Sequence, residues 1–235
     1  IRKEISNGKS FDEANEYAKA VLTYLTLALG KTLDYNSALT IWDRNQGSIG
    51  HTFTRHAYDW TWEFGEFDIT RDDMSFGWAL RNVVKALKGI VKELEDVDGE
   101  VEVVFGDAAK SPLKYMPKDG FDVLFTDPPY YGSVQHGELS DFFYVWYRLI
   151  FKDLYPEAFG DELTPKSEEA VYNEVRVGKI PSKEKVRRRK AEDIYSRIAR
   201  ERYEEKLREI FKAHYKALRD GGIPVSYTHL TLPTN

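Results

Sequence analysis

Residues 121–126, Phe-Asp-Val-Leu-Phe-Thr, form a nearly continuous apolar run that stops at two consecutive prolines. A strand that is apolar along its whole length needs cover on both faces, as in a parallel sheet enclosed by helices. Residues 100–105 read as a preceding strand, and a further strand is expected to begin at Ile223, after a helix that a pair of glycines ends. This order of elements indicates a crossover, so the sequence predicts an α/β domain with a Rossmann-like fold.

The rest of the chain is expected to be helical or irregular. Apolar residues at three- and four-residue spacing predict amphipathic helices, the first with Ser10 as its N-cap, over about 11–34, 77–95, 139–151 and 185–219. Between the first two helices lies a segment rich in aromatic side chains, most of which we expect in the core: Trp42, Phe53, Tyr58, Trp60, Trp62, Phe64 and Phe67. The expected parts are a helical, aromatic-rich segment at 1–76, a partial α/β domain at 77–224 with an insertion at about 152–184, and a tail at 225–235.

The residues that follow the apolar run, Asp127-Pro128-Pro129-Tyr130, are candidates for a catalytic loop. In an open α/β sheet, ligands bind beyond the carboxyl ends of the strands, which is where this loop would lie. The prolines fix the backbone and remove two donors, so the Asp127 carboxylate and the Pro128 carbonyl can accept the hydrogens of a planar exocyclic amine. Tyr130 can stack on an extruded base. The alternative is a structural turn in which Tyr130 caps the core.

Gly106-Asp107-Ala108, at the end of the preceding predicted strand, is a candidate cofactor site. The Asp107 carboxylate could accept a hydrogen bond from the adenine amino group of S-adenosylmethionine, and Gly106 would let the cofactor approach the backbone. Alternatively, Asp107 caps a short helix that follows it, and the two roles are compatible.

Contacts with nucleic acid are expected from local patches, because a net charge of -5 argues against binding by bulk electrostatics. Tyr131 is either a second wall of a base pocket or a core aromatic. The densest basic cluster could contact phosphates or form a solvated helix face paired with nearby acidic residues, and its central members are Lys185, Arg187, Arg188 and Arg189. The histidines show no paired spacing with carboxylates, so no metal is expected.

Several of these segments together resemble a prokaryotic family of large amino-DNA methyltransferases that is known as a domain of unknown function. The resembling segments are Leu33–Ser37, Thr52–Arg55, Trp62–Phe64, Gly106–Ala108, Thr126–Tyr131 and Gly137–Trp146. The resemblance implies a methyltransferase fold that uses S-adenosylmethionine, with the Asp127–Tyr130 loop catalytic and the Gly106-Asp107 strand end near the cofactor. In that family a glycine-rich cofactor loop and an acidic ribose-binding residue lie upstream of these motifs, and this sequence contains neither.

The expected activity is methyl transfer to an exocyclic amino group of a nucleic-acid base, with adenine N6 of DNA as the first choice. Transfer to carbon 5 of cytosine is disfavoured, because that route needs a cysteine thiolate and the sequence has no cysteine. Cytosine N4, guanine N2 of RNA and a protein glutamine amide remain open acceptors. A non-catalytic nucleic-acid-binding or interaction module with a methyltransferase-like fold is the alternative from another class.

The ends of the sequence add two expectations. No apolar run approaches bilayer-spanning length and the first residues form no signal peptide, so we expect a cytoplasmic protein without a membrane segment. The first residue is not methionine, and Val225 to Thr234 resemble a translated sequencing adapter, with a native Thr-rich tail as the alternative. We therefore expect the 235-residue chain to be a fragment that is poorly soluble and binds S-adenosylmethionine weakly or not at all.

Overall fold

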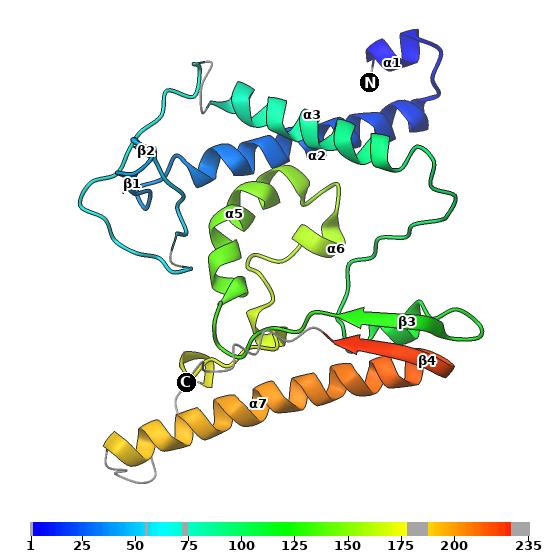
Figure 1. The fold of residues 1–235 in the computed structure, drawn as a ribbon. Helices are drawn as coiled ribbons and strands as arrows, with labels where there is room; N and C mark the ends of the chain where they lie inside the picture. The colour runs from blue at the N-terminus through cyan, green and yellow to red at the C-terminus, as the bar shows by residue number, and fades with distance from the viewer. Residues whose placement is uncertain (1, 55, 72–74, 178–187, 227–235) are drawn as a thin grey trace. The chain divides into compact units, whose positions relative to one another are not determined.

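The computed structural model describes residues 2–54, 56–71, 75–177 and 188–226, and Figure 1 labels their elements. The chain forms two compact units, each assembled from two stretches of sequence. Unit 1 comprises Ile1–Glu102 and Glu138–Thr164, and unit 2 comprises Val103–Gly137 and Pro165–Asn235. The segments expected at 1–76 and 77–224 follow one another along the chain, whereas these units interleave.

Unit 1 is mainly helical. Its elements are α1 (Arg2–Ser6), α2 (Phe11–Asp34), β1 (Trp42–Asp43), β2 (Ser48–Ile49), α3 (Phe76–Glu93), α5 (His136–Phe151), whose first two residues belong to unit 2, and α6 (Pro156–Phe159). The strands β1 and β2 pair antiparallel, and α2 packs against α3 (Figure 1). The predicted helices at 11–34, 77–95 and 139–151 are confirmed to within three residues at each end.

Serine side chains begin the two long helices of unit 1. The Ser10 Oγ accepts the Glu13 N–H at 3.2 Å, and the Glu13 carboxylate accepts the Ser10 N–H at 2.8 Å, so the two residues form a capping box at the start of α2. The Ser75 Oγ accepts the Trp78 N–H at 3.2 Å at the start of α3. The predicted N-cap at Ser10 is confirmed.

The aromatic segment of unit 1 is less buried than expected. Phe53 forms edge contacts with Phe142 and Phe143 of α5, at ring-centroid distances of 5.4 and 5.9 Å. The expectation that most of these aromatic side chains are core residues is wrong, since the exposed ones are Trp42, Tyr58, Trp60, Trp62 and Phe64. They lie in short strands and loops, which bring too few neighbouring side chains to cover an indole or phenyl ring.

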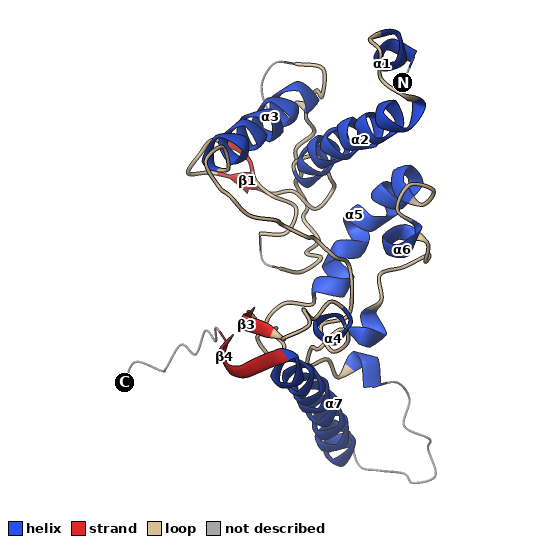
Figure 2. Cartoon of the chain, turned by 90° about the vertical axis from the view of Figure 1, so that its right-hand side faces the viewer, coloured by secondary structure: helices blue, strands red, loops and turns tan. Residues whose placement is uncertain are grey.

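Unit 2 contains a parallel strand pair and a long helix. Its elements are α4 (Ser111–Lys114), β3 (Phe121–Thr126), the 3-10 turns η1 (Lys166–Glu168) and η2 (Val175–Val177), α7 (Arg188–Ala217) and β4 (Leu218–Ser226). β3 and β4 pair in parallel, with Val123 opposite Ile223 and Thr126 opposite Ser226. The strand at 121–126, the long helix and the strand that contains Ile223 are confirmed. Figure 2 shows β4 continuing directly from the end of α7.

Two details of the predicted crossover are wrong. The helix ends at Ala217, and the glycine pair lies inside β4, where Gly221 has φ +76° and forms part of an irregularity opposite Asp122. Residues 100–105 form no strand, and Val103 is 90% exposed. A strand is stabilised by its hydrogen-bonded neighbour, and within the described ranges this segment has no neighbouring strand.

The described residues therefore form a mixed, mainly helical fold with few short strands. Both of their sheets have two strands, and a Rossmann sheet is not formed among them. Of the tail at 225–235, Val225 and Ser226 belong to β4, and the remainder lies outside the described residues. None of the helices that the structure describes has the length and apolar character needed to cross a membrane.

Candidate functional site

The loop after β3 lines a pocket in unit 2. The pocket has a volume of about 390 Å³, within the range of roughly 300–1,000 Å³ that is typical of small-molecule sites. It begins at the carboxyl end of a parallel strand, as predicted from the sequence. The four predicted catalytic residues are all in its lining, which consists of Asp127, Pro128, Pro129, Tyr130, Ser133, Val134 and His136.

Hydrogen bonds fix the shape of this loop. The Tyr130 hydroxyl donates to the Asp127 Oδ1 at 2.6 Å, so the phenol ring and the carboxylate are held together. The Pro129 carbonyl accepts the Tyr131 N–H at 3.0 Å and the Tyr203 hydroxyl at 2.9 Å. Within the described residues no hydrogen bond reaches the Pro128 carbonyl. That carbonyl and the second oxygen of Asp127 therefore remain available as acceptors.

Tyr131 lies beside the pocket rather than in its lining. Its ring stacks on Tyr172 with centroids 4.4 Å apart and planes 16° apart, and its edge meets Tyr203 at 5.3 Å. The residue has φ +55°, an unusual conformation for a non-glycine residue. Tyr131 is 41% exposed and does not line the pocket, so it is not a core aromatic, and its role as a second wall of the base pocket stays a prediction.

Asp107 closes a turn just before α4. Its Oδ1 accepts the Ala109 N–H at 2.9 Å, and its Oδ2 lies 3.2 Å from the Lys110 Nζ. The Ala109 hydrogen bond, followed by the Lys110 contacts, lowers the pKa of the Asp107 carboxyl below its ordinary value, so the group is charged at neutral pH. Lys110, rather than Asp107, occupies the N-cap position of α4. The prediction that Asp107 caps this helix is therefore wrong, and its side chain instead closes the turn that leads into the helix.

The neighbouring glycine has a packing role. A Cβ at Gly106 would overlap the Ser111 hydroxyl, so a larger residue here would require the Ser111 side chain to move. The Asp107 side chain is 30% exposed, and a carboxylate has about four acceptor positions, of which the turn uses part. Asp107 can therefore accept a further hydrogen bond from a ligand amine.

His214 of α7 connects the two candidate motifs. Its Nδ1 lies 2.8 Å from the Thr126 Oγ1, and the Ala108 backbone forms another hydrogen bond with the ring. Burial lowers the pKa of His214 below its ordinary value, and the Ala108 contact opposes this effect in part. The imidazole is therefore neutral at pH 7.

Tyr203 and His214 are site residues that the sequence pattern does not single out. They are eleven residues apart, which is about three helical turns, so they lie on the same face of α7. This spacing is visible in the sequence. Which helix face meets the loop after β3 depends on how α7 packs, and the sequence pattern does not give that.

The basic cluster is described in part only. Lys185 and Arg187 lie outside the described residues, and of Arg188 and Arg189, which begin α7, only the backbone is described. Further along the helix, Arg197 lies 3.9 Å from Glu201 in an exposed pair. An exposed pair of this kind fits a solvated helix face, and it leaves the role of the cluster itself as a prediction.

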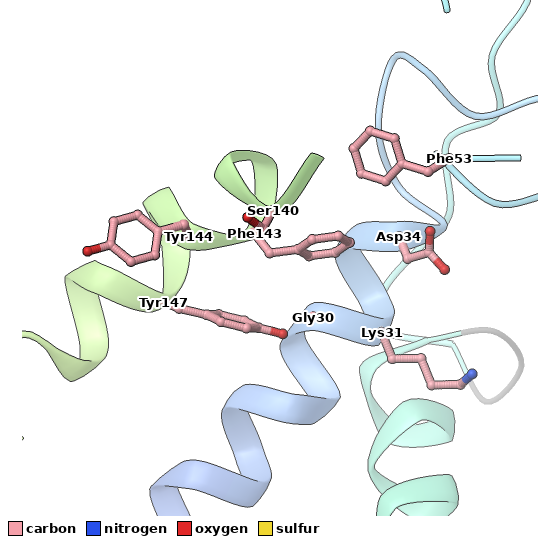
Figure 3. Close-up of a pocket in the computed structure, with 8 residues that line it drawn as sticks. All are labelled: Gly30, Lys31, Asp34, Phe53, Ser140, Phe143, Tyr144 and Tyr147. Atoms are coloured by element: carbon pink, nitrogen blue, oxygen red, sulfur yellow. The ribbon is translucent and has the colours of Figure 1, made fainter. Parts of the chain in front are cut away.

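A second pocket, of about 520 Å³, lies in unit 1 (Figure 3). Its lining consists of Gly30, Lys31, Asp34, Phe53, Ser140, Phe143, Tyr144 and Tyr147. The rings of Phe143 and Tyr147 point from α5 toward Gly30 of α2, where any larger side chain would overlap the Tyr147 hydroxyl. The Asp34 carboxylate is engaged by the His51 Nδ1 at 2.5 Å. The pocket thus marks the aromatic packing between α2 and α5, and no predicted site residue lines it.

The loop after β3 and the turn at Gly106-Asp107, both contacted by α7, are therefore the best candidate site in the described part of this protein. In the part of the chain that the structure describes, no group of three or more His, Cys, Asp or Glu side chains is placed to hold a metal ion. The comparisons with protein-family models, curated proteins and solved structures found no match to this chain.

Proposed function

We propose that this protein transfers a methyl group from S-adenosylmethionine to an exocyclic amino group of a nucleic-acid base, with adenine N6 of DNA as the preferred acceptor. The observation that carries the proposal is the pocket after β3, which combines the Asp127 carboxylate, the Pro128 carbonyl and the Tyr130 ring. This combination suits an amine attached to a flat ring, because it offers two acceptors beside an aromatic face.

The pocket residues would prepare the amine for reaction. The lone pair of such an amine is delocalised into the base, and accepting both of its hydrogens pulls the nitrogen toward a tetrahedral form. Asp127 Oδ2 and the Pro128 carbonyl are the acceptors we assign to this task. The hydrogen bond from the Tyr130 hydroxyl holds Asp127 in place and fixes the ring on which the base would stack.

S-adenosylmethionine supplies an electrophilic methyl group when it is bound. The fit of this chain to that cofactor rests on Asp107, which is charged, partly exposed and able to accept from the adenine amino group. Gly106 leaves the backbone of the same turn accessible. We assign no residue to the methionine part, because the sequence contains no glycine-rich loop upstream of these motifs.

We also infer that β3 and β4 belong to a Rossmann-like sheet with further strands. Their parallel pairing supports this inference, as do the exposed Val123 and Phe125, which a neighbouring strand or helix would cover. The preference for DNA rests on the resemblance of the motifs to amino-DNA methyltransferases. A DNA substrate in a prokaryotic cell would place the protein in the cytoplasm.

The proposal is tested by radiolabel transfer. The protein is incubated with methyl-labelled S-adenosylmethionine and, separately, with DNA, RNA and a protein mixture. Label in DNA that is resistant to protease supports the proposal, and label confined to RNA or protein redirects it to those acceptors. Tight binding of DNA without any transfer would support a non-catalytic interaction module instead.

Asp107 gives a prediction about the cofactor. We expect Asp107→Ala to weaken S-adenosylmethionine binding by roughly 1.5–3 kcal/mol, the usual contribution of a charge-assisted hydrogen bond, as measured by calorimetry. Lys110→Ala is the matched control, because it removes the ion pair on the same turn and leaves the carboxylate. Equal affinities of wild type and Asp107→Ala would restrict Asp107 to its role in the turn.

The basic cluster gives a prediction about the nucleic acid. Replacing Arg187, Arg188 and Arg189 with glutamine should weaken DNA binding to a similar degree for all sequences, because phosphate contacts carry no base information. The slope of log affinity against log salt should decrease by roughly 0.9 for each phosphate that the variant no longer neutralises. A slope identical to that of wild type, measured by fluorescence anisotropy, would assign the cluster to a solvated helix face.

A further inference from the structure

One histidine contacts the immediate neighbours of both candidate motifs. Thr126, whose hydroxyl lies 2.8 Å from the His214 Nδ1, directly precedes Asp127. Ala108, whose backbone forms the other hydrogen bond with the ring, directly follows Asp107. A single side chain thus joins the end of β3 to the turn before α4.

α7 packs closely against the rest of unit 2 at this connection. Ala213 and Ala217, on either side of His214, are 4% and 0% exposed, so small side chains let the helix approach the rest of unit 2 closely. Three turns earlier on the same face, the Tyr203 hydroxyl holds the Pro129 carbonyl at 2.9 Å. α7 therefore contacts the segment 126–131 on both sides of Asp127.

We propose that His214 is a positioning residue for the candidate site, which holds Asp107 and Asp127 at a fixed separation by bonding to Ala108 and Thr126. This inference rests on the proposed function, because the separation matters only if a cofactor bound at Asp107 must meet an acceptor bound at Asp127. The two carboxylates touch the ligands, whereas His214 acts through the backbone and side chain beside them.

The chemistry of the ring makes this connection sensitive to pH. The hydrogen bond between the ring and the Ala108 backbone uses a ring N–H as the donor and the Ala108 carbonyl as the acceptor. In the neutral ring the other nitrogen, Nδ1, can then accept a hydrogen bond from the Thr126 hydroxyl. In a protonated ring Nδ1 carries a hydrogen and can no longer accept, so the hydrogen bond from the Thr126 hydroxyl would be lost in its present geometry. Because the folded-state pKa lies below the ordinary value, the connection is complete above about pH 6.5 and is lost as the pH falls through the folded-state pKa.

Burial, and no neighbouring charge, lowers the pKa of this histidine. The charged residues near it on α7 and on the segments packed against α7 are Asp107, Lys110, Lys114, Asp122, Asp127, Arg176, Lys206, Lys212, Lys216, Arg219 and Asp220. Histidine is the side chain whose charge ordinarily changes between about pH 5 and 8. A variant that removes the titration of His214 alone is therefore required.

The test compares two substitutions at this position by amide hydrogen exchange. His214→Phe keeps a ring and removes both hydrogen bonds, so the Ala109 and Tyr131 amides should exchange roughly five- to tenfold faster, as for the loss of one or two hydrogen bonds, while α2 exchanges as in wild type. His214→Gln keeps a donor and an acceptor without a titrating group. Relative to the intrinsic exchange rate at each pH, the two amides of His214→Gln should exchange as in wild type at pH 7.5. At pH 5.5 they should not show the faster relative exchange that we expect of wild type.

His56→Asn is the matched control, since it removes an exposed histidine of unit 1 and asparagine tolerates the positive φ of that position. The control should leave both amides and their pH dependence unchanged. Wild-type exchange at Ala109 and Tyr131 in His214→Phe would overturn the inference even if methyl transfer is observed. If His214→Phe does not fold, an unchanged pH dependence in His214→Gln would overturn it.

Failure of the proposed function is distinguishable from failure of this inference. Wild-type protein that neither binds S-adenosylmethionine nor transfers label would contradict the proposed function, whereas the exchange measurements need no cofactor. In active protein, His214→Phe should lower kcat with little change in the KM for DNA, because the separation of the two bound ligands changes and the base pocket does not.

Discussion

Asp127→Asn is expected to lower methyl transfer by roughly 10²–10³-fold, because the variant loses the negative charge that we assign to the amine in the transition state. The amide keeps the shape of the side chain and an oxygen that can still accept from the Tyr130 hydroxyl, so the loop should keep its conformation. The measurement is the single-turnover rate of label transfer with saturating DNA, accompanied by circular dichroism and the affinity for DNA.

Asp153→Asn is the control for this substitution, since Asp153 is exposed after the end of α5 and belongs to unit 1. Its rate should equal that of wild type. A rate for Asp127→Asn within a factor of three of wild type would remove Asp127 from the reaction and leave the Asp-Pro-Pro-Tyr segment as a structural turn.

Gly120→Ala should produce the largest loss of stability in unit 2. Gly120 has φ +83° immediately before β3, and a Cβ there would lie 2.6 Å from the Arg219 backbone nitrogen. The backbone conformation costs a non-glycine residue about 1–2 kcal/mol, and the clash with the backbone of β4 adds to this. We expect the free energy of unfolding to fall by roughly 2–4 kcal/mol, as measured by urea denaturation.

Gly89→Ala is a control that should change the free energy of unfolding in the opposite direction. Gly89 lies inside α3 with open space where a Cβ would be, so alanine should stabilise the helix by roughly 0.5–1 kcal/mol. A Gly120→Ala variant with the wild-type urea midpoint would show that β3 and β4 do not approach each other as closely as the structure indicates. The arrangement of strands from which the candidate site extends would then be incorrect.

The elements that the sequence predicted well are those with a strong local signal. The helix at 11–34 combines a regular apolar face with the Ser10–Glu13 capping box, and its bounds agree with the structure. The strand at 121–126 combines apolar residues with a preceding glycine and following prolines, which limit it on both sides. Local signals of this kind do not depend on how distant parts of the chain pack.

The predictions that failed depend on partners far away in the sequence. Residues 100–105 have the composition of a strand, but a strand needs a neighbour, and none of the described strands pairs with this segment. The size of Trp60 and Trp62 predicts a core position, yet they are 93% and 103% exposed, since no described element covers their loop. Only the packing of α7 brings Tyr203 and His214 to the loop after β3, so no local signal identifies them.

The identity of the methylated nucleoside tests the central claim most directly. DNA incubated with S-adenosylmethionine and the protein is digested to nucleosides and analysed by mass spectrometry, with Asp127→Asn in parallel. The proposed function predicts N6-methyldeoxyadenosine with wild type and a background level with the variant. DNA that is bound by the wild-type protein but contains no methylated nucleoside above background, when RNA and protein are also unmodified, would contradict it.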